Sequence, residues 1–220
     1  MSKRAKQLLI LFLILIFPSL FYVILSGTDH DIVGLPYYGP KEVNASGDTI
    51  YHEVSNLSQF LQKNEQPVPD SLLNGKIKIV SFLENNEQSF RVMEQLKSTA
   101  ERFQDKNDVL ILTLYNQNET DREEINNILN TYKSGTKGWH FLITPETLTL
   151  QNFAREELFV SQETKLQNEM TAIVLLDDEN RIRGYFDGLQ YVETKELRNA
   201  VKALRFKKLR PVKKQSDEGK

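Results

Sequence analysis

The sequence predicts an α/β domain, a three-layer sandwich in which helices flank a central mixed sheet, with an N-terminal hairpin extension and one preceding transmembrane helix. Residues 77–83 form an apolar run, and from residue 90 apolar residues recur at helical spacing, which is typical of the start of a β-α-β unit. Strand-like and helix-like segments then alternate, and two late strands flank an acidic turn. This order indicates parallel strands with an antiparallel edge.

The N-terminal segment, residues 8–25, is almost wholly apolar and follows Lys3, Arg4 and Lys6. Its 18 residues are close to the shortest length that spans a bilayer as a helix. A cleaved signal peptide is the alternative, but the sequence after residue 25 is a poor cleavage site. Because basic flanks stay inside, we expect residues 1–7 in the cytoplasm and a single-pass anchor in the inner membrane. The domain then lies on the periplasmic, extracytoplasmic side.

Residues 26–57 are predicted to be a linker, because recurring glycine and proline break regular structure. Within this linker, residues 35–38 have two alternatives: they dock on the domain, or they lie at the bilayer surface, where tyrosine is favoured. We expect the domain to span residues 58–206. The charged tail, residues 207–220, is predicted to be flexible.

The first half of the domain is predicted from its apolar spacing. Its strands are apolar and rich in β-branched residues, its first helix has apolar residues every third or fourth position, and Thr120 or Asp121 can cap its second helix. The expected elements are, in order, a hairpin (60–68), a turn (69–74), a strand (77–83), a helix (90–103), a strand (108–115) and a helix (120–132).

The second half ends in an antiparallel pair. Pro145 suits the first turn of a helix, and the acidic run from Asp177 to Asn180 is predicted to be a hairpin turn because it lacks calcium-loop spacing. The expected elements are a strand (139–143), a helix (145–154), a polar connection (155–168), paired strands (170–176 and 182–186) and a helix (193–206). This order is thioredoxin-like. Four residues are expected to share one core on adjacent strands: Phe82, Leu112, Phe141 and Val174.

Composition excludes several kinds of function. A net charge of −2 argues against a nucleic-acid partner. The chain has no cysteine, which removes disulfides, thiol redox chemistry and cysteine-ligated zinc. The only imidazoles, those of His30, His52 and His140, do not have metal-ligand spacing. We therefore expect no metal and no cofactor.

Ligands of open α/β sheets collect at the carboxyl ends of the strands, so any chemistry is expected between Glu84 and Phe90. That loop has no nucleophile beside a base, no glycine-rich phosphate cradle and no ligand cluster. Glu84, Glu87 and Glu169 are the acidic candidates, because converging carboxylates can do acid–base work or hold a hard cation. Solvated loop acids are the commoner case.

Six short motifs in this order resemble the Sco/SenC family, membrane-anchored thioredoxin-like proteins that carry copper to cytochrome c oxidase. The resemblance covers residues 60–206 and the single N-terminal anchor. The motifs are Gly75-Lys76-Ile77, Ser81-Phe82-Leu83, Met93-Glu94-Gln95-Leu96-Lys97, Trp139-His140-Phe141-Leu142, Ile173-Val174-Leu175-Leu176-Asp177 and Gly184-Tyr185-Phe186-Asp187-Gly188.

The chain departs from the family at the metal site. The family has Cys-x-x-x-Cys at the start of the first helix and a histidine before the late hairpin. These positions fall near Asn86, Phe90 and Glu169, which cannot supply the soft ligands that Cu(I) requires. The resemblance therefore implies a degenerate, structural site in which Phe90 fills one sulfur position, Asn86 caps the helix and Glu169 faces both.

The resemblance implies an accessory or binding role in respiratory-complex assembly, that of cytochrome c oxidase, without copper binding by the chain itself. A protein partner in that assembly, or a copper-loaded relative, is then expected, and no enzymatic activity. The alternative is a thioredoxin-fold enzyme that uses non-cysteine chemistry at Glu84, Glu87 or Glu169.

Overall fold

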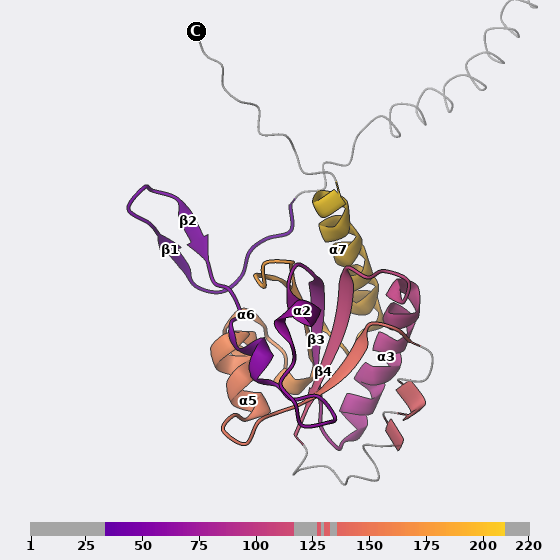
Figure 1. Ribbon diagram of the computed structural model, residues 1–220. Helices are drawn as coiled ribbons and strands as arrows, with labels where there is room; N and C mark the ends of the chain where they lie inside the picture. Colours follow the sequence, from indigo (N-terminus) through magenta and orange to yellow (C-terminus); the bar gives the residue numbers. More distant parts are fainter. Residues whose placement is uncertain (1–33, 117–126, 129, 133–135, 210–220) are drawn as a thin grey trace, which may run out of the picture. The chain divides into compact units, whose positions relative to one another are not determined.

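The computed structural model describes residues 34–116, 127–128, 130–132 and 136–209 (Figure 1). The predicted anchor, residues 8–25, lies outside the described residues, as do residues 210–220 and most of the helix predicted over 120–132. Within the described ranges, no helix combines the length and apolar character needed to cross a bilayer.

A five-stranded mixed sheet forms the centre of the domain, with strand order β5-β4-β3-β6-β7. The neighbours β3, β4 and β5 run parallel, and β6 and β7 add an antiparallel edge, as the sequence predicts. The strands are β3 (Ile77–Leu83), β4 (Val109–Tyr115), β5 (Trp139–Ile143), β6 (Ala172–Leu176) and β7 (Ile182–Asp187).

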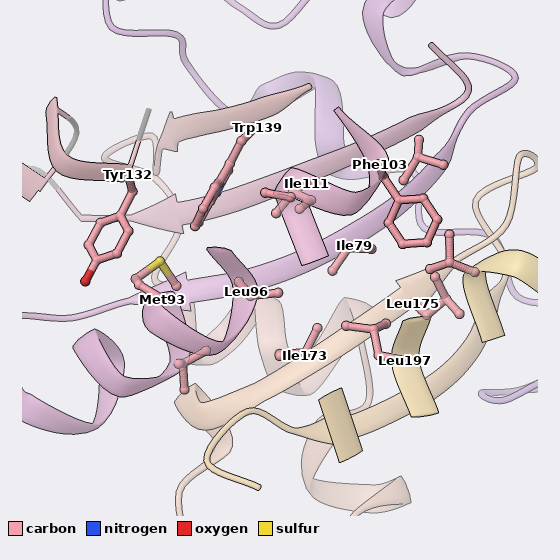
Figure 2. Close-up of a cluster of buried hydrophobic side chains, with 14 of the residues drawn as sticks. Ile79, Met93, Leu96, Phe103, Ile111, Tyr132, Trp139, Ile173, Leu175 and Leu197 are labelled. Atoms are coloured by element: carbon pink, nitrogen blue, oxygen red, sulfur yellow. The ribbon is translucent and has the colours of Figure 1, made fainter. Parts of the chain in front are cut away.

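Helices α3 (Glu87–Phe103) and α7 (Tyr191–Leu209) cover one face of this sheet. Figure 2 shows how Met93 and Leu96 from α3 and Leu197 from α7 meet the side chains of the strands in one buried cluster. Every residue of β3 and β4 is buried, because both faces of the sheet are covered. That double burial explains why these strands are continuous apolar runs in the sequence.

Short elements cover the opposite face. They are η1 (Asn56–Gln59), α2 (Asp70–Leu73), α5 (Leu150–Asn152), the π-helical turn η2 (Phe153–Glu157) and α6 (Val160–Glu163). Phe82, Leu112 and Val174 share the core on this face, as predicted. The prediction for Phe141 was wrong: it packs on the α3 face, because its β4 partner is Thr113 and successive strand residues point to opposite faces.

The segment before β6 is more regular than expected. The helix predicted over 145–154 begins only at Leu150, where the Thr149 hydroxyl accepts a hydrogen bond from the Asn152 amide (3.2 Å). The predicted polar connection, 155–168, contains the end of η2 and all of α6. Leu158 is fully buried there, but the charged residues that precede it obscure the helical pattern in the sequence.

The predicted linker also contains structure. A two-stranded hairpin, β1 (Lys41–Val43) and β2 (Thr49–Tyr51), projects from the domain (Figure 1). It precedes the position at which the sequence analysis predicted a hairpin. The hairpin predicted over 60–68 is reduced to one bridge, between Leu61 and Pro67. Leu61 also exchanges two backbone hydrogen bonds with Ile143, at 2.9 and 2.7 Å, and so extends the sheet beyond β5.

Residues 35–38 dock on the domain, which confirms the first of their two predicted alternatives. The Arg183 side chain donates hydrogen bonds to the carbonyls of Leu35 and Pro36, and its guanidinium carbon lies 3.9 Å from the centre of the Tyr37 ring. Asp177 neutralises the buried guanidinium through a 3.0 Å ion pair. We call these contacts the Arg183 clamp. The compact unit of the chain includes residues from Leu35 onward.

Candidate functional site

The candidate site lies where β3 ends and β6 begins. These strands are antiparallel neighbours, so the carboxyl end of β3 meets the amino end of β6. The loop after β3 consists of residues 84–86, and the short helix η3 (Glu169–Thr171) leads directly into β6. The topology therefore brings the two predicted halves of the site, residues 84–90 and Glu169, to the same end of the sheet.

Asn86 is the N-cap of α3, as predicted. Its side-chain oxygen accepts a hydrogen bond from the Ser89 amide (2.8 Å), which satisfies one of the free amides of the first turn. Its side-chain nitrogen donates to Oε2 of Glu84 (2.9 Å), and the buried Ser89 hydroxyl accepts a bond from the Glu84 amide (3.1 Å). Both polar ends of Asn86 are therefore occupied by its own loop.

The acidic candidates do not converge. Oε1 of Glu84 accepts a hydrogen bond from Gln151 of α5 (3.1 Å), so both oxygens of this carboxylate are bound by amide groups. Glu87 is exposed in the first turn of α3, where the helix dipole favours a negative charge. Glu169 forms a 2.8 Å ion pair with Arg155 of η2.

A different pair of residues joins η3 to α3. Asn168 donates a hydrogen bond from its side chain to Oε1 of Gln88 (2.8 Å), and its side-chain oxygen caps η3 by accepting from the Met170 amide (3.0 Å). Sequence analysis missed both residues. The signal for Asn168 was its place just before a short helical turn, where asparagine is a favoured cap. The partner in α3, 80 positions away in the chain, carried no such signal.

Phe90 lies half-buried and packs against the core between the sheet and α3. The three positions predicted to form a degenerate site, Asn86, Phe90 and Glu169, thus hold a capping amide, a packed ring and a carboxylate in an ion pair. No group of three or more histidine, cysteine or acidic side chains within the described part of the chain is arranged to hold a metal ion.

A buried polar network underlies the site on the α3 face of the sheet. The Thr113 hydroxyl accepts a hydrogen bond from the indole nitrogen of Trp139 (2.9 Å) and lies 2.9 Å from the Ser81 hydroxyl. It also donates its one proton to the sulfur of Met93 (3.9 Å). In the hydrogen bond between the two hydroxyls, Ser81 is therefore the donor and Thr113 the acceptor. Every polar group of this network therefore has a partner in an otherwise apolar core.

A second buried polar side chain, that of Lys78, lies on the opposite face. Its ammonium donates to the Lys76 carbonyl (2.7 Å), and burial lowers its pKa from 10.5 to about 8 despite the attraction of Asp177. Lys78 lies near the start of β3, at the end of the sheet away from Asn86, and belongs to no part of the candidate site. Sequence analysis treated this strand as a buried apolar run and did not single out Lys78.

No protein-family model and no curated protein matches the chain in sequence. Solved structures share its fold. A SCO1/SenC family lipoprotein from Bacillus anthracis str. Ames is 16% identical, with a TM-score of 0.53 over 66% of this chain and 91% of that one. BsSco, a member of the Sco family of cytochrome c oxidase assembly proteins, is 15% identical, with a TM-score of 0.54 over 70% of this chain and 93% of its own.

A third similar structure is that of a proposed electron transfer protein from Aquifex aeolicus VF5. It is 18% identical, with a TM-score of 0.51 over 70% of this chain and 97% of that one. These similarities confirm the predicted thioredoxin-like fold with a central mixed sheet flanked by helices.

Proposed function

We propose that this chain is a membrane-anchored, non-catalytic Sco-like protein whose domain lies outside the cytoplasm and has an accessory or binding role in cytochrome c oxidase assembly, without binding copper. One observation carries the proposal. At the metal-site positions, Asn86 caps α3, Phe90 packs against the core and Glu169 is paired with Arg155. Each side chain is thus committed to a structural contact on a scaffold that Sco proteins share.

The ligand chemistry supports the absence of copper binding. Cu(I) prefers soft thiolate and thioether ligands, and the chain has no cysteine. The two methionines expected nearest this end, Met93 and Met170, are buried in the two separate cores of the domain. Neither core offers a set of exposed sulfur ligands.

The same contacts support a non-catalytic role. A general acid or base must reach the proton that it transfers, and a carboxylate in such a role usually lies in a site that shifts its pKa. Both oxygens of Glu84 are bound by neighbouring amides, and Glu169 is bound by Arg155. The assembly role is inferred from the shared fold, which alone does not determine function.

The proposal is tested by Cu(I) titration of the full chain in detergent micelles, in competition with a chromophoric chelator. The parent is expected to bind no Cu(I) in the submicromolar range. The triple variant Asn86→Cys, Phe90→Cys and Glu169→His is the positive control, because it restores two thiolates and an imidazole. Submicromolar binding by the parent would contradict the proposal. Failure of the folded triple variant to bind copper would show that the three positions do not form a Sco-like site.

A further inference from the structure

A groove of about 360 Å³ follows the outer edge of β7. The rings of Tyr38, Tyr185 and Phe186 line it, and the carboxylates of Glu163, Asp187 and Glu193 lie around them. The lining comes from both layers of the domain, because Tyr185 packs with the α5–α6 face while Phe186 belongs to the α3–α7 face. We call this feature the β7 groove. Its lining does not include Asn86, Phe90 or Glu169.

The backbone along the groove is the edge of the sheet. β7 pairs with β6 on one side, and on the other side the Ile182 carbonyl accepts a hydrogen bond from the Tyr38 amide (3.1 Å). Arg183 and Gly184 are buried, and Arg183 is covered by residues 35–38. From Tyr185 to Asp187, the part of β7 that lines the groove, no strand or bridge within the described residues pairs with the outer edge. An unpaired stretch of an edge strand offers its backbone donors and acceptors to an added strand.

The groove also has an uncompensated negative charge. Its lining includes three carboxylates and one cation, Lys165, and none of these four side chains forms an ion pair within the part of the chain described. Among the described residues, Glu163 and Asp187 accept only backbone amide hydrogen bonds, from Gly39 (3.3 Å) and Leu189 (2.9 Å). Asp187 and Glu193 are half-buried. Partial burial strengthens the attraction of these carboxylates for a cation, because less water screens it.

The aromatic rings suit a cationic side chain as well. Tyr38 and Tyr185 meet edge to face, with ring centres 5.1 Å apart, and the Tyr185 hydroxyl is fixed by a 2.7 Å hydrogen bond to the Leu158 carbonyl. Burial, and next the negative charge of Glu163, raise the pKa of Tyr185, so its hydroxyl stays protonated and keeps this bond as a donor. Aromatic faces beside carboxylates attract lysine and arginine side chains.

We propose that the β7 groove binds an extended, lysine- or arginine-rich segment of another protein, which adds as a strand to β7 and places a cationic side chain among the tyrosines and carboxylates. The uncovered edge favours a peptide, because a small polyamine uses only the charge and not the backbone groups. The proposal goes beyond the assembly role and does not depend on the state of the Asn86 end of the sheet.

The test is a titration of the full chain in micelles with the fluorescent peptide acetyl-Val-Lys-Val-Arg-Val-Lys-amide, followed by anisotropy. The groove variant is Glu163→Gln, Asp187→Asn and Glu193→Gln. The control variant is Glu101→Gln, Asp105→Asn and Glu146→Gln, which removes the same charge from exposed positions away from the groove. Binding to the groove variant is expected to weaken about tenfold or more, and binding to the control variant by less than about twofold.

A second peptide separates strand addition from simple charge attraction. N-methylation of alternate residues keeps the charges but removes backbone donors, so the methylated peptide is expected to bind at least about tenfold more weakly. Equal weakening by both triple variants, equal affinity of the methylated peptide, or equally tight binding of spermidine would each overturn the proposal. If the groove variant does not fold, Glu193→Gln alone is the substitute, with an expected weakening of about threefold, and unchanged binding would count against the groove.

Discussion

Phe82 is completely buried near the middle of the sheet, on the face covered by α5 and η2. Replacing it with alanine leaves a cavity that the packed neighbours cannot fill, so Phe82→Ala is expected to lower the free energy of unfolding by about 3–5 kcal/mol. Urea denaturation measures this loss. The control is Phe206→Ala on α7, where the side chain is 47% exposed and the loss should be small. A loss below about 1 kcal/mol for Phe82→Ala would contradict its central position.

Lys78 gives the domain a specific pH dependence. Its pKa is about 8 in the folded chain and 10.5 when solvated, so between these values the unfolded chain binds more protons and the free energy of unfolding rises with pH. The stabilisation from this group is present above pH 10.5 and is lost as pH falls towards 8.

The comparison with Lys78→Met isolates this contribution, because the buried tyrosines titrate equally in both proteins. From pH 8 to 10.5 the parent should gain up to about 3 kcal/mol of unfolding free energy relative to the variant. Urea denaturation across that range provides the measurement. A constant difference between the two proteins would show that Lys78 is solvated in the folded state.

The hydroxyl of Thr113 holds the buried polar network together. Thr113→Val preserves the shape of the side chain but leaves the Trp139 indole N–H and the Ser81 hydroxyl without their acceptor. The expected loss of unfolding free energy is about 2–4 kcal/mol, because two buried donors become unsatisfied. Thr113→Ser, which keeps the hydroxyl, should lose clearly less. Thermal denaturation of both variants tests this ordering, and equal losses would mean that packing alone accounts for the effect.

At this scale, the local contacts were the ones that the sequence could predict. Asn86 caps a helix that starts one residue later, so the whole signal lies within a few positions. The partner of Glu169 could not be predicted, because Arg155 is 14 positions away and their meeting depends on how η2 packs. Lys78 was missed because six apolar or small neighbours in β3 dominate the pattern of that strand.

Among the elements, α3 depends on its first turn. Asn86→Ala removes the acceptor for the Ser89 amide and a donor to Glu84, so it is expected to lower the free energy of unfolding by about 1–2 kcal/mol. Asn86→Asp keeps the capping oxygen but places a second carboxylate beside Glu84, and should have an intermediate effect. Urea denaturation distinguishes the three proteins. An unchanged stability in Asn86→Ala would mean that water replaces the cap at no cost.

Strands were easier to predict than short helices. β3 and β4 are buried on both faces, so each is an apolar run that no other element imitates at that length. The three-residue helix α5 and the π-helical turn η2 have no repeating period long enough to recognise. The β1–β2 hairpin was missed for a different reason: its strands are exposed, so its turn residues looked like those of a linker.

For the whole molecule, we expect residues 1–25 to stay attached and to hold the domain outside the cytoplasmic membrane. The reasons are the length of the apolar segment and the basic residues before it. Mass spectrometry of the mature N-terminus, together with protease accessibility in spheroplasts, checks both parts. A soluble chain that begins near Ser26 or Gly27, or a domain that is protected in spheroplasts, would contradict the expected topology.

The architecture of the domain could be predicted because many apolar positions support the same order of strands and helices. A site depends on a few side chains, and at the Asn86 end most of them form hydrogen bonds with one another. The β7 groove was invisible in the sequence for a related reason. Tyr38, Glu163 and Tyr185 are brought together only when residues 35–38 dock beside β7.

If residues 8–25 anchor the chain as the sequence predicts, the Arg183 clamp would set the length of the tether between domain and bilayer. The predicted linker of residues 26–57, fully extended, has a reach of about 110 Å. With residues 35–38 fixed on β7, only the nine residues 26–34 remain for this purpose, and their reach is about 32 Å. With that anchor, a tether of this length would keep the domain in a thin shell above the membrane. A partner embedded in the same membrane would then meet the domain at a high effective concentration, and even a weak interface would be occupied for much of the time.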